Sequence, residues 1–328
     1  MTPASHFRHA RFTGDCTVEL THSPIPQVLP GEVIVSVRRT ALCGSDNRLW
    51  RDGAVQIPGH EIFGVVEQAG HMRHGERVCV YIPVYCGYCT ACTRGHTQSC
   101  TTGSVLIGWN RDGGFGEYVR VPEQCLLPVP DHIEDRLAPL LLDTIGTSAH
   151  AVRTVQRLLG DLNSQRILIT GAGPIGMGVL IALQDSGCEK VTVYDPNTSR
   201  SRFAENLGAQ LLDDHTNQQF DAIFECSGAH AARDDAITRV AAGGAVVLIG
   251  ENSTPWPIQE GPVFRRKDFA LLRSFYFPVS EHNDNIALLL RQQKLYAKIA
   301  DTDVTLDQLA AAYRQFVAGE TMKPLLTL

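Results

Sequence analysis

Residues 169–176 read ITGAGPIG, and this short stretch decides how the second half of the chain folds. Its glycines stand in the spacing G-x-G-x-x-G and enclose a Pro-Ile pair: Gly171, Gly173, Pro174, Ile175 and Gly176. A buried apolar strand precedes the glycines and an apolar helical stretch follows them. Glycines in this context allow a tight turn and let N–H groups at a helix N-terminus approach the pyrophosphate of a dinucleotide. The alternative is a glycine-rich turn with a purely structural role.

An acidic residue follows the next predicted strand. VTVYD ends at Asp195, about 20 residues beyond Gly176, which is the usual distance in dinucleotide-binding units. A carboxylate there accepts hydrogen bonds from the adenosine ribose hydroxyls and repels a 2′-phosphate. Asp195 therefore favours NAD over NADP.

The two halves of the chain differ in their hydrophobic pattern. Residues 1–145 contain short alternating runs such as EVIVSVRR (32–39) and GEYVRVP (116–122), which predict an all-β, barrel-like domain. In residues 146–286, short buried strands alternate with helical stretches, which predicts a parallel sheet. Residues 287–328 form a C-terminal segment. The predicted class is α/β, with a β-barrel domain and a doubly wound parallel-sheet domain.

Composition excludes several classes of function. The net charge of -6, the pI near 6.0 and the lack of a basic run argue against a nucleic-acid surface. The apolar run 167–183 contains four glycines and a proline, so we interpret it as strand, turn and helix rather than a membrane span. The N-terminal residues carry no secretory pattern, which predicts a cytoplasmic protein. There, ten cysteines are thiols or metal ligands rather than disulfides.

Four cysteines stand within the segment CGYCTACTRGHTQSC, at Cys86, Cys89, Cys92 and Cys100. Four thiolates at this spacing can close a tetrahedron around Zn²⁺ and leave no open position, so such a site braces a loop and performs no chemistry. The alternatives are a disulfide pair, which needs an oxidising compartment, and a thioredoxin-like C-x-x-C, which needs a βα context. The spacing favours structural zinc.

Two shorter motifs, CGSD and GHE, supply a second set of candidate ligands. Cys43 and His60 are a soft thiolate and an imidazole, which suit zinc. Glu61 adds a carboxylate, and Asp46 can accept the second imidazole N–H and orient the ring. Taken singly, a buried cysteine is often a small core residue and a histidine is often simply satisfied.

Six motifs follow one another along essentially the whole chain: CGSD (43–46), GHE (59–61), the four-cysteine segment (86–100), DGGFGEYVRVP (112–122), GAGPIG (171–176) and ECSG (225–228). In this order they resemble the zinc-dependent medium-chain dehydrogenases, the alcohol, sorbitol and threonine dehydrogenase superfamily. The resemblance implies a GroES-like β-barrel catalytic domain, an inserted Rossmann domain and a C-terminal segment that returns to the barrel.

The resemblance also implies a catalytic zinc held by Cys43 and His60. Polyol-type members carry a Glu-Pro-Leu seven residues before a histidine, and here Asp143 stands seven residues before His150. Asp143 is therefore the implied third ligand, with Glu61 as an exchanging or alternative ligand. The other interpretation of Asp143 is a helix-capping aspartate.

Further roles come with the resemblance. Ser45 matches the hydroxyl that contacts the substrate oxygen and begins a proton relay. Many members end that relay at a histidine where this chain has Arg48, and arginine cannot act as a base. The relay then ends in water or another group, or Arg48 contacts cofactor phosphate or an anionic substrate. Arg200 matches a basic position near the adenosine ribose, or is a plain surface arginine. Ser227 matches the turn that passes the nicotinamide.

The implied activity is hydride transfer between NAD and a secondary alcohol, polyol or sugar-type substrate, with two zinc ions per chain. One alternative is a biosynthetic NAD(P)H-dependent carbonyl reductase. Another is a non-catalytic zinc- and nucleotide-binding protein, which Arg48 and Asp143 favour. The resemblance also implies a homodimer or homotetramer, with a small-molecule substrate and neither nucleic acid nor membrane as partner. Three aromatic residues are candidates for pocket lining or for core packing: Trp50, Trp109 and Phe115.

Overall fold

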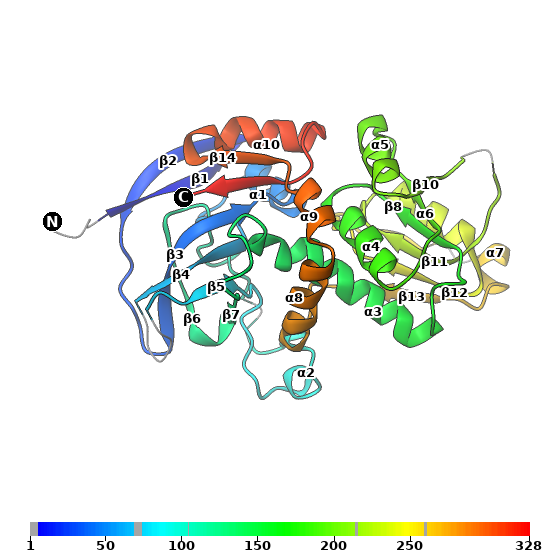
Figure 1. The fold of residues 1–328 in the computed structure, drawn as a ribbon, viewed down its shortest axis with the longest axis horizontal. Coiled ribbons are helices and arrows are strands. Elements are labelled where there is room, and N and C mark those ends of the chain that lie inside the picture. Colours follow the sequence, from blue (N-terminus) through cyan, green and yellow to red (C-terminus); the bar gives the residue numbers. More distant parts are fainter. Residues whose placement is uncertain (1–5, 69–73, 104, 214–215, 259–260) are drawn as a thin grey trace. The chain divides into compact units, whose positions relative to one another are not determined.

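The computed structural model describes residues 6–68, 74–103, 105–213, 216–258 and 261–328 (Figure 1). These residues form two compact units. The first unit comprises the described residues of Met1–Leu142 together with Phe277–His282 and Ala297–Leu328. The second unit comprises the described residues of Asp143–Tyr276 and Asn283–Tyr296. Each unit is described below by itself.

A seven-stranded sheet organises the first unit. Its order is β14-β15-β3-β4-β5-β7, with β6 also paired to β3, and a separate hairpin joins β1 to β2. The strands are β1 (His6–Gly14), β2 (Thr17–Pro24), β3 (Glu32–Ala41), β4 (Glu61–Gln68), β5 (Arg77–Val80), β6 (Tyr118–Pro122), β7 (Leu126–Pro128), β14 (Thr302–Thr305) and β15 (Pro324–Thr327). The helices are the 3-10 turn η1 (Gly44–Asp46), α1 (Asn47–Asp52), α2 (Thr90–Thr93) and α10 (Leu309–Ala318).

The core of the first unit is built from both ends of the chain. Phe12 of β1 packs edge-to-face against Tyr313 of α10, with ring centroids 5.4 Å apart. Trp50 and Phe115 belong to the same cluster and are 4% and 0% exposed, so core packing accounts for both. Because β15 pairs with β3, the C-terminal strand extends the sheet that the N-terminal half begins. Long-range burial of this kind ties sequence-distant segments into one core.

A six-stranded parallel sheet organises the second unit, in the order β10-β9-β8-β11-β12-β13. The strands are β8 (Ile167–Thr170), β9 (Val191–Tyr194), β10 (Gln210–Leu211), β11 (Phe220–Glu225), β12 (Val240–Leu248) and β13 (Ala270–Arg273). Numbered along the chain, this is the order 3-2-1-4-5-6 of a Rossmann sheet, with its switch point between β8 and β11. The predicted fold class is therefore confirmed.

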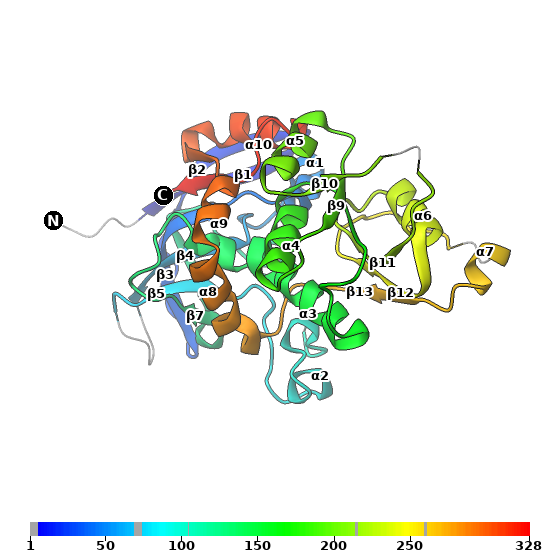
Figure 2. The same ribbon diagram turned by 45° about the vertical axis from the view of Figure 1, so that its right-hand side comes forward.

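Helices cover the parallel sheet. They are α3 (Ser148–Leu159), α4 (Pro174–Asp185), α5 (Thr198–Asn206), α6 (His230–Arg239) and α7 (Pro262–Arg265), while α8 (His282–Arg291) and α9 (Gln293–Ile299) follow later in the chain. The helix α4 contacts β8 and β11, and α6 contacts β11 and β12 (Figure 2).

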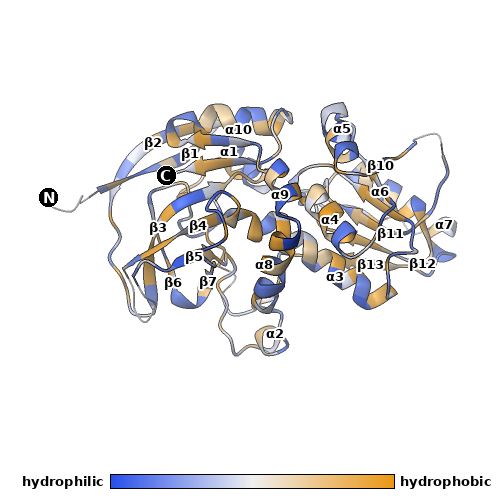
Figure 3. Cartoon of the chain, in the orientation of Figure 1, coloured by the Kyte–Doolittle hydropathy of each residue, from blue (hydrophilic) through white to orange (hydrophobic). Residues whose placement is uncertain are grey.

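Hydrophobic residues run through β8, β12 and α4 (Figure 3). Strands covered on both faces bury near-continuous apolar runs, which is why the sequence pattern of this sheet lacks alternation. Within the part of the chain that the structure describes, no helix combines the length and hydropathy needed to span a bilayer.

Candidate active site

Cys43 and His60 lie at one end of the β3–β4 strand pair. The two strands are antiparallel neighbours, and Ala41 at the end of β3 pairs with Glu61 at the start of β4. Cys43 lies two residues beyond Ala41, and His60 lies immediately before Glu61. The strand register therefore brings the thiol and the imidazole to the same edge of the sheet.

The His60 imidazole has a defined orientation. Its Nδ1 lies 2.8 Å from Oδ1 of Asp46, and both side chains are buried. Because a carboxylate accepts hydrogen bonds, this contact places the ring proton on Nδ1 and leaves Nε2 as a lone-pair donor. A second partner that orients the ring is the sort of support that metal-ligating histidines require.

Gly59 sets the backbone conformation immediately before His60. Its φ is +90°, in the left-handed region, and a Cβ at this position would lie 2.5 Å from the Phe115 ring. Glycine alone satisfies both the backbone angle and the contact. The glycine of the GHE motif is thus a geometric requirement for placing His60.

Three candidate ligands of the first unit converge. The ligand atoms of Cys43, His60 and Glu61 all lie within 4.8 Å of one another, and all three residues are buried. Asp143 opens the π-helical turn η5 (Asp143–Thr147), and the hydroxyl of Thr147 donates to its Oδ1 at 3.0 Å. A thiolate, an imidazole and carboxylates are the donors that zinc prefers. The residues present therefore fit a zinc ion.

A buried ion pair joins Glu61 to the far end of the chain. Nζ of Lys323 donates to Oε1 of Glu61, and the two side chains are 1% and 0% exposed. Lys323 directly precedes β15, in which Leu325 pairs with Ala41 of β3. This pairing brings Lys323 to the same edge of the sheet as Cys43 and His60. Sequence reasoning missed Lys323. The available signal was a charged residue directly before the apolar run PLLTL.

Ser45 and Arg48 lie beside this cluster. The Ser45 hydroxyl donates to Sγ of Cys43 at 3.3 Å. Arg48 is exposed, and its Cζ lies 5.0 Å from the ring centroid of Trp109. The Trp109 ring is in turn 5.8 Å from the His60 ring. Of the three aromatic candidates, Trp109 is thus the one next to a predicted site residue.

The four cysteines of residues 86–100 form a second ligand group. Their Sγ atoms all lie within 4.8 Å of one another, and none of the ten cysteines, all in described residues, forms a disulfide. Backbone N–H donors, that of Cys92 foremost, lower the pKa of the Cys89 thiol to about 5, whereas burial raises the pKa of Cys92 to about 11. Backbone amides that favour thiolates suit a closed metal site.

The glycine loop joins β8 to α4 in the second unit. The N–H of Gly171 donates to the carbonyl of Tyr194 at 2.8 Å. A Cβ on Gly176 would lie 1.9 Å from the carbonyl oxygen of Gly171, so no larger residue fits there. Gly173 is the N-cap of α4, and Pro174 at the first helical position suits the start of a helix. These features fit a loop that receives a pyrophosphate.

Asp195 lies against that loop. Its Oδ2 accepts the Ala172 N–H at 2.7 Å, and its Oδ1 accepts the Asn197 N–H at 2.8 Å. Arg200 is close as well, since its Nη1 would lie 3.9 Å from a Cβ built on Gly173. The structure therefore brings the predicted glycines, Asp195 and Arg200 together.

The ECSG turn stands on the neighbouring strand. Thr170 at the end of β8 pairs with Glu225 at the end of β11, so both turns leave the carboxyl edge of the sheet at its switch point. The buried Oε1 of Glu225 accepts the N–H and hydroxyl of Ser227, at 2.8 and 2.5 Å, and the N–H of Gly228 at 2.8 Å. The ordering role of Glu225 was not predicted.

Comparison with known families accounts for both units. Residues 29–131 match the alcohol dehydrogenase GroES-like domain, and residues 140–327 match the glucose dehydrogenase C-terminus. The chain belongs to the zinc-dependent medium-chain dehydrogenases. As such it is an oxidoreductase that acts on a small alcohol or polyol with zinc and a nicotinamide cofactor, as predicted.

Sequence relatives of this dehydrogenase include L-threonine 3-dehydrogenases. The protein from Mesorhizobium japonicum is 33% identical over 261 residues, which cover 72% of this chain and 74% of the relative. The protein from Rhizobium rhizogenes is 33% identical over 257 residues, which cover 70% of this chain and 72% of the relative.

Solved structures of similar fold include two dehydrogenases. An alcohol dehydrogenase from Escherichia coli CFT073, in complex with NADH, has a TM-score of 0.88 and 24% identity over 99% of this chain and 100% of the other. The 2R,3R-butanediol dehydrogenase from Bacillus subtilis has a TM-score of 0.84 and 21% identity over 98% of this chain and 99% of the other. At these identities the likeness concerns the fold.

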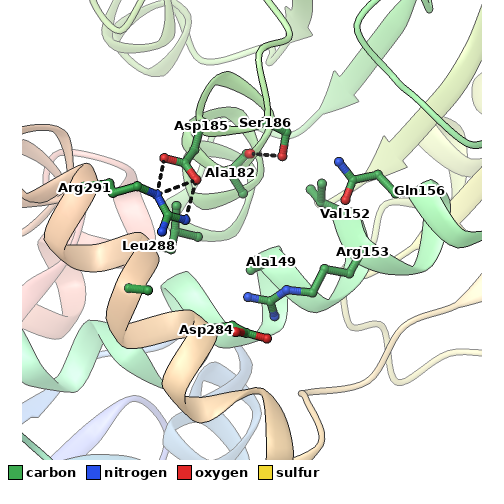
Figure 4. A pocket seen from close by; sticks show the side chains of 11 residues that line it. Ala149, Val152, Arg153, Gln156, Ala182, Asp185, Ser186, Asp284, Leu288 and Arg291 are labelled. Carbon is green, nitrogen blue, oxygen red and sulfur yellow. Dashed lines mark hydrogen bonds and ion pairs between the residues drawn. The ribbon is translucent and has the colours of Figure 1, made fainter.

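The second unit of the dehydrogenase also contains a pocket of about 220 Å³ between α3, α4 and α8 (Figure 4). Arg291 holds Asp185 there through Nε and Nη2, and Arg153 donates to Oδ1 of Asn285 at 3.0 Å. The lining includes none of the predicted site residues and carries both signs of charge. This pocket is thus separate from the groups described above.

Proposed function

We propose that this chain oxidises a secondary alcohol, polyol or sugar-type hydroxyl with NAD, at a zinc held by Cys43, His60 and Asp143. Glu61 is the exchanging or alternative ligand. The observation that carries the proposal is the convergence of three buried donor atoms, those of Cys43, His60 and Glu61, within 4.8 Å. When bound, zinc supplies Lewis acidity toward the substrate oxygen, and NAD supplies the hydride acceptor.

The chain's own residues orient these groups and move a proton. Asp46 holds the proton of His60 on Nδ1, so that Nε2 stays available as a ligand atom. Ser45, whose hydroxyl contacts Sγ of Cys43, receives the proton that the substrate hydroxyl loses and passes it on. Arg48 cannot accept it, because a guanidinium stays protonated, so the relay ends in solvent water.

The nucleotide site is assigned to the carboxyl edge of the parallel sheet. The loop from Gly171 to Gly176 receives the pyrophosphate, and Asp195 receives the ribose hydroxyls with Arg200 beside them. The turn that contains Ser227 is proposed to lie beside the nicotinamide ring. Supporting this assignment is the contact of Asp195 with the loop backbone at Ala172. A carboxylate in that place opposes a 2′-phosphate, which favours NAD over NADP.

A second zinc, held by the four cysteines of residues 86–100, is assigned a structural role. Four protein thiolates would complete the coordination of such a zinc and would leave no position for substrate or water. Its proposed task is to keep the loop of residues 86–100 in one conformation.

The domain bounds of the proposed enzyme are 1–145 for the GroES-like catalytic domain, 146–286 for the Rossmann domain and 287–328 for the returning segment. We propose a cytoplasmic homodimer or homotetramer. Four of the ten cysteines have the spacing of zinc ligands, which suits a reducing compartment.

Zinc content and NADH formation test the proposal together. Protein purified without added metal or chelator is expected to hold two zinc ions per chain. With polyols and secondary alcohols it should form NADH, with a lower kcat/KM when NADP replaces NAD. One zinc per chain would mean that only the four-cysteine site is filled, and would contradict the assignment of Cys43, His60 and Asp143 as ligands of a catalytic zinc. Two zinc ions without turnover on any alcohol would favour a non-catalytic role.

A further inference from the structure

Arg48 lies near the candidate zinc site, and its guanidinium has no ion-pair partner among the described residues. It is exposed on α1, directly after the η1 turn that contains Ser45. Among the residues that the structure describes, none forms an ion pair or hydrogen bond with its guanidinium. Its one close partner is the Trp109 ring, 5.0 Å from Cζ. Stacking on an aromatic face occupies the flat surface of the guanidinium and leaves its N–H edge open.

The backbone of Trp109, whose indole is the platform for Arg48, is held in place by its neighbours. Its N–H donates to the carbonyl of Leu106 at 3.1 Å, and its carbonyl accepts a hydrogen bond from Nε2 of Gln56. The preceding Gly108 packs so tightly on the peptide before His60 that a Cβ there would lie 2.6 Å from the carbonyl oxygen of Gly59. The backbone that carries the indole is therefore held next to His60.

The same indole lies near both a permanent positive charge and a candidate zinc ligand. The ring of Trp109 is 5.8 Å from that of His60, with an angle of 38° between the planes. Arg48 can therefore lie no farther from the imidazole than the two separations together. Ser45 stands three residues before Arg48 on a helical turn, so both share one face. A small molecule on this face meets the hydroxyl at one end and the guanidinium at the other.

We infer that Arg48, stacked on Trp109, selects substrates that carry an anionic group a few bonds from the hydroxyl to be oxidised, that is, hydroxy acids. This inference rests on the proposed function. A carboxylate can accept two parallel hydrogen bonds from the free edge of the guanidinium, which a neutral alcohol cannot. Hydrogen bonds to a charged group contribute about 10- to 100-fold to affinity. The other source of an anion is the cofactor diphosphate, and the experiment separates the two.

The test compares each acid with its neutral counterpart. The substrates are 3-hydroxybutyrate with 3-hydroxybutyramide, and L-threonine with L-threoninamide; NADH affinity is measured in parallel. In the unmodified enzyme we expect kcat/KM to favour the acid over the amide by about 10-fold or more. Arg48→Gln should abolish that preference chiefly by raising KM for the acid. It should leave kcat/KM for the amide and the Kd of NADH within about two-fold of their original values.

Two further variants isolate the stacked cation. Arg51→Gln removes an exposed charge from the same helix, where Arg51 pairs with Asp52 at 3.0 Å, and is expected to leave the acid preference intact. Trp109→Leu removes the platform and should lower the preference while Arg48 remains. Zinc content and thermal unfolding of each variant establish that the fold is retained.

Other outcomes overturn the inference. A weaker NADH Kd in Arg48→Gln with an unchanged acid preference would assign the guanidinium to the cofactor. If Arg48→Gln and Arg51→Gln prefer the acid over the amide equally, and NADH affinity is also unchanged, the Arg48 guanidinium recognises neither the substrate nor the cofactor. If no substrate is turned over, the proposed function fails. Calorimetric titration of the zinc-loaded protein with 3-hydroxybutyrate and its amide then decides. Acid-selective binding that is lost in Arg48→Gln supports the anion site. Equal binding of the acid and the amide overturns the inference.

Discussion

The two ligand clusters of this protein are built in opposite ways. Cys86, Cys89, Cys92 and Cys100 lie on one short segment, and their Sγ atoms come together through local turns around α2. The other cluster brings Cys43 together with His60 and Glu61, from two separate parts of the chain. Its ion pair to Lys323 spans 262 residues.

This difference in construction determines which interactions each cluster depends on. A local cluster needs only its own turns and its metal, so damage to it should stay local. An assembled cluster depends on strand register, on the glycine before His60 and on the C-terminal strand. Damage to any of these should therefore be felt at the assembled cluster. Substitutions at each cluster test this contrast.

Cys43→Ser should have the largest effect on activity. It removes a thiolate from the assembled cluster, and loss of a catalytic metal costs several kcal/mol, so kcat should fall by about 10³-fold or more. NADH binding should persist, because the nucleotide loop is untouched. Steady-state kinetics and NADH fluorescence measure the two effects. Cys16→Ser, at a half-buried cysteine outside both clusters, is the matched control, and normal turnover in Cys43→Ser would show that the site is elsewhere.

Lys323→Met should have the largest effect on stability. It leaves the Glu61 carboxylate buried without this partner, and breaking a buried pair typically costs about 3–5 kcal/mol. Equilibrium unfolding in urea measures the loss. Adding Glu61→Gln to the same chain removes the buried charge and should recover most of the stability. If the double variant is no more stable than Lys323→Met, the cost arises from packing rather than charge.

Asp46→Asn should weaken the assembled cluster without dismantling it. The amide keeps the shape of the side chain but no longer stabilises the Nδ1–H tautomer of His60 as a carboxylate does, and such changes cost about 10- to 100-fold in metal affinity or activity. Competition with a chromogenic chelator gives the affinity of the second zinc. Asp52→Asn, at an exposed position of helix α1, is the control. An unchanged affinity would mean that ring orientation contributes little.

Cys89→Ser should have the smallest effect on catalysis. One zinc per chain should be lost, and proteolytic cleavage within residues 86–100 should accelerate about ten-fold or more as the loop opens. The kcat should change by less than about ten-fold, since a closed structural site takes no part in chemistry. Mass spectrometry of the fragments locates the cleavage. A loss of activity as large as in Cys43→Ser would show that the two clusters are coupled.

The same contrast explains how far the sequence alone could predict the molecule. The four-cysteine segment and the loop from Gly171 to Gly176 are local patterns, so their spacing carried the information. Strand and helix alternation predicted the parallel sheet because each unit of it is local. Asp143 was proposed as a ligand through its distance from His150 in a family pattern. Chemistry alone could not have chosen it over other aspartates.

Other features depend on long-range packing and left no readable signal. Lys323 joins Glu61 only because β15 pairs with β3, and strand pairing across the whole chain is not visible in a single sequence. Trp109 was one of three aromatic candidates, and burial in the core accounts for Trp50 and Phe115. Glu225 belonged to a noted motif, yet its three hydrogen bonds to the turn appear only when the backbone is folded.

Tolerance to substitution differs sharply around the active site, and this has an evolutionary consequence. Gly59 is closed to change, since any side chain there would strike Phe115 at 2.5 Å. Arg48 stands in solvent a short distance away, where replacement disturbs only its stacking on Trp109. Proteins with this architecture can therefore change their substrate specificity through single substitutions at residue 48. Selection should retain the glycine that positions His60.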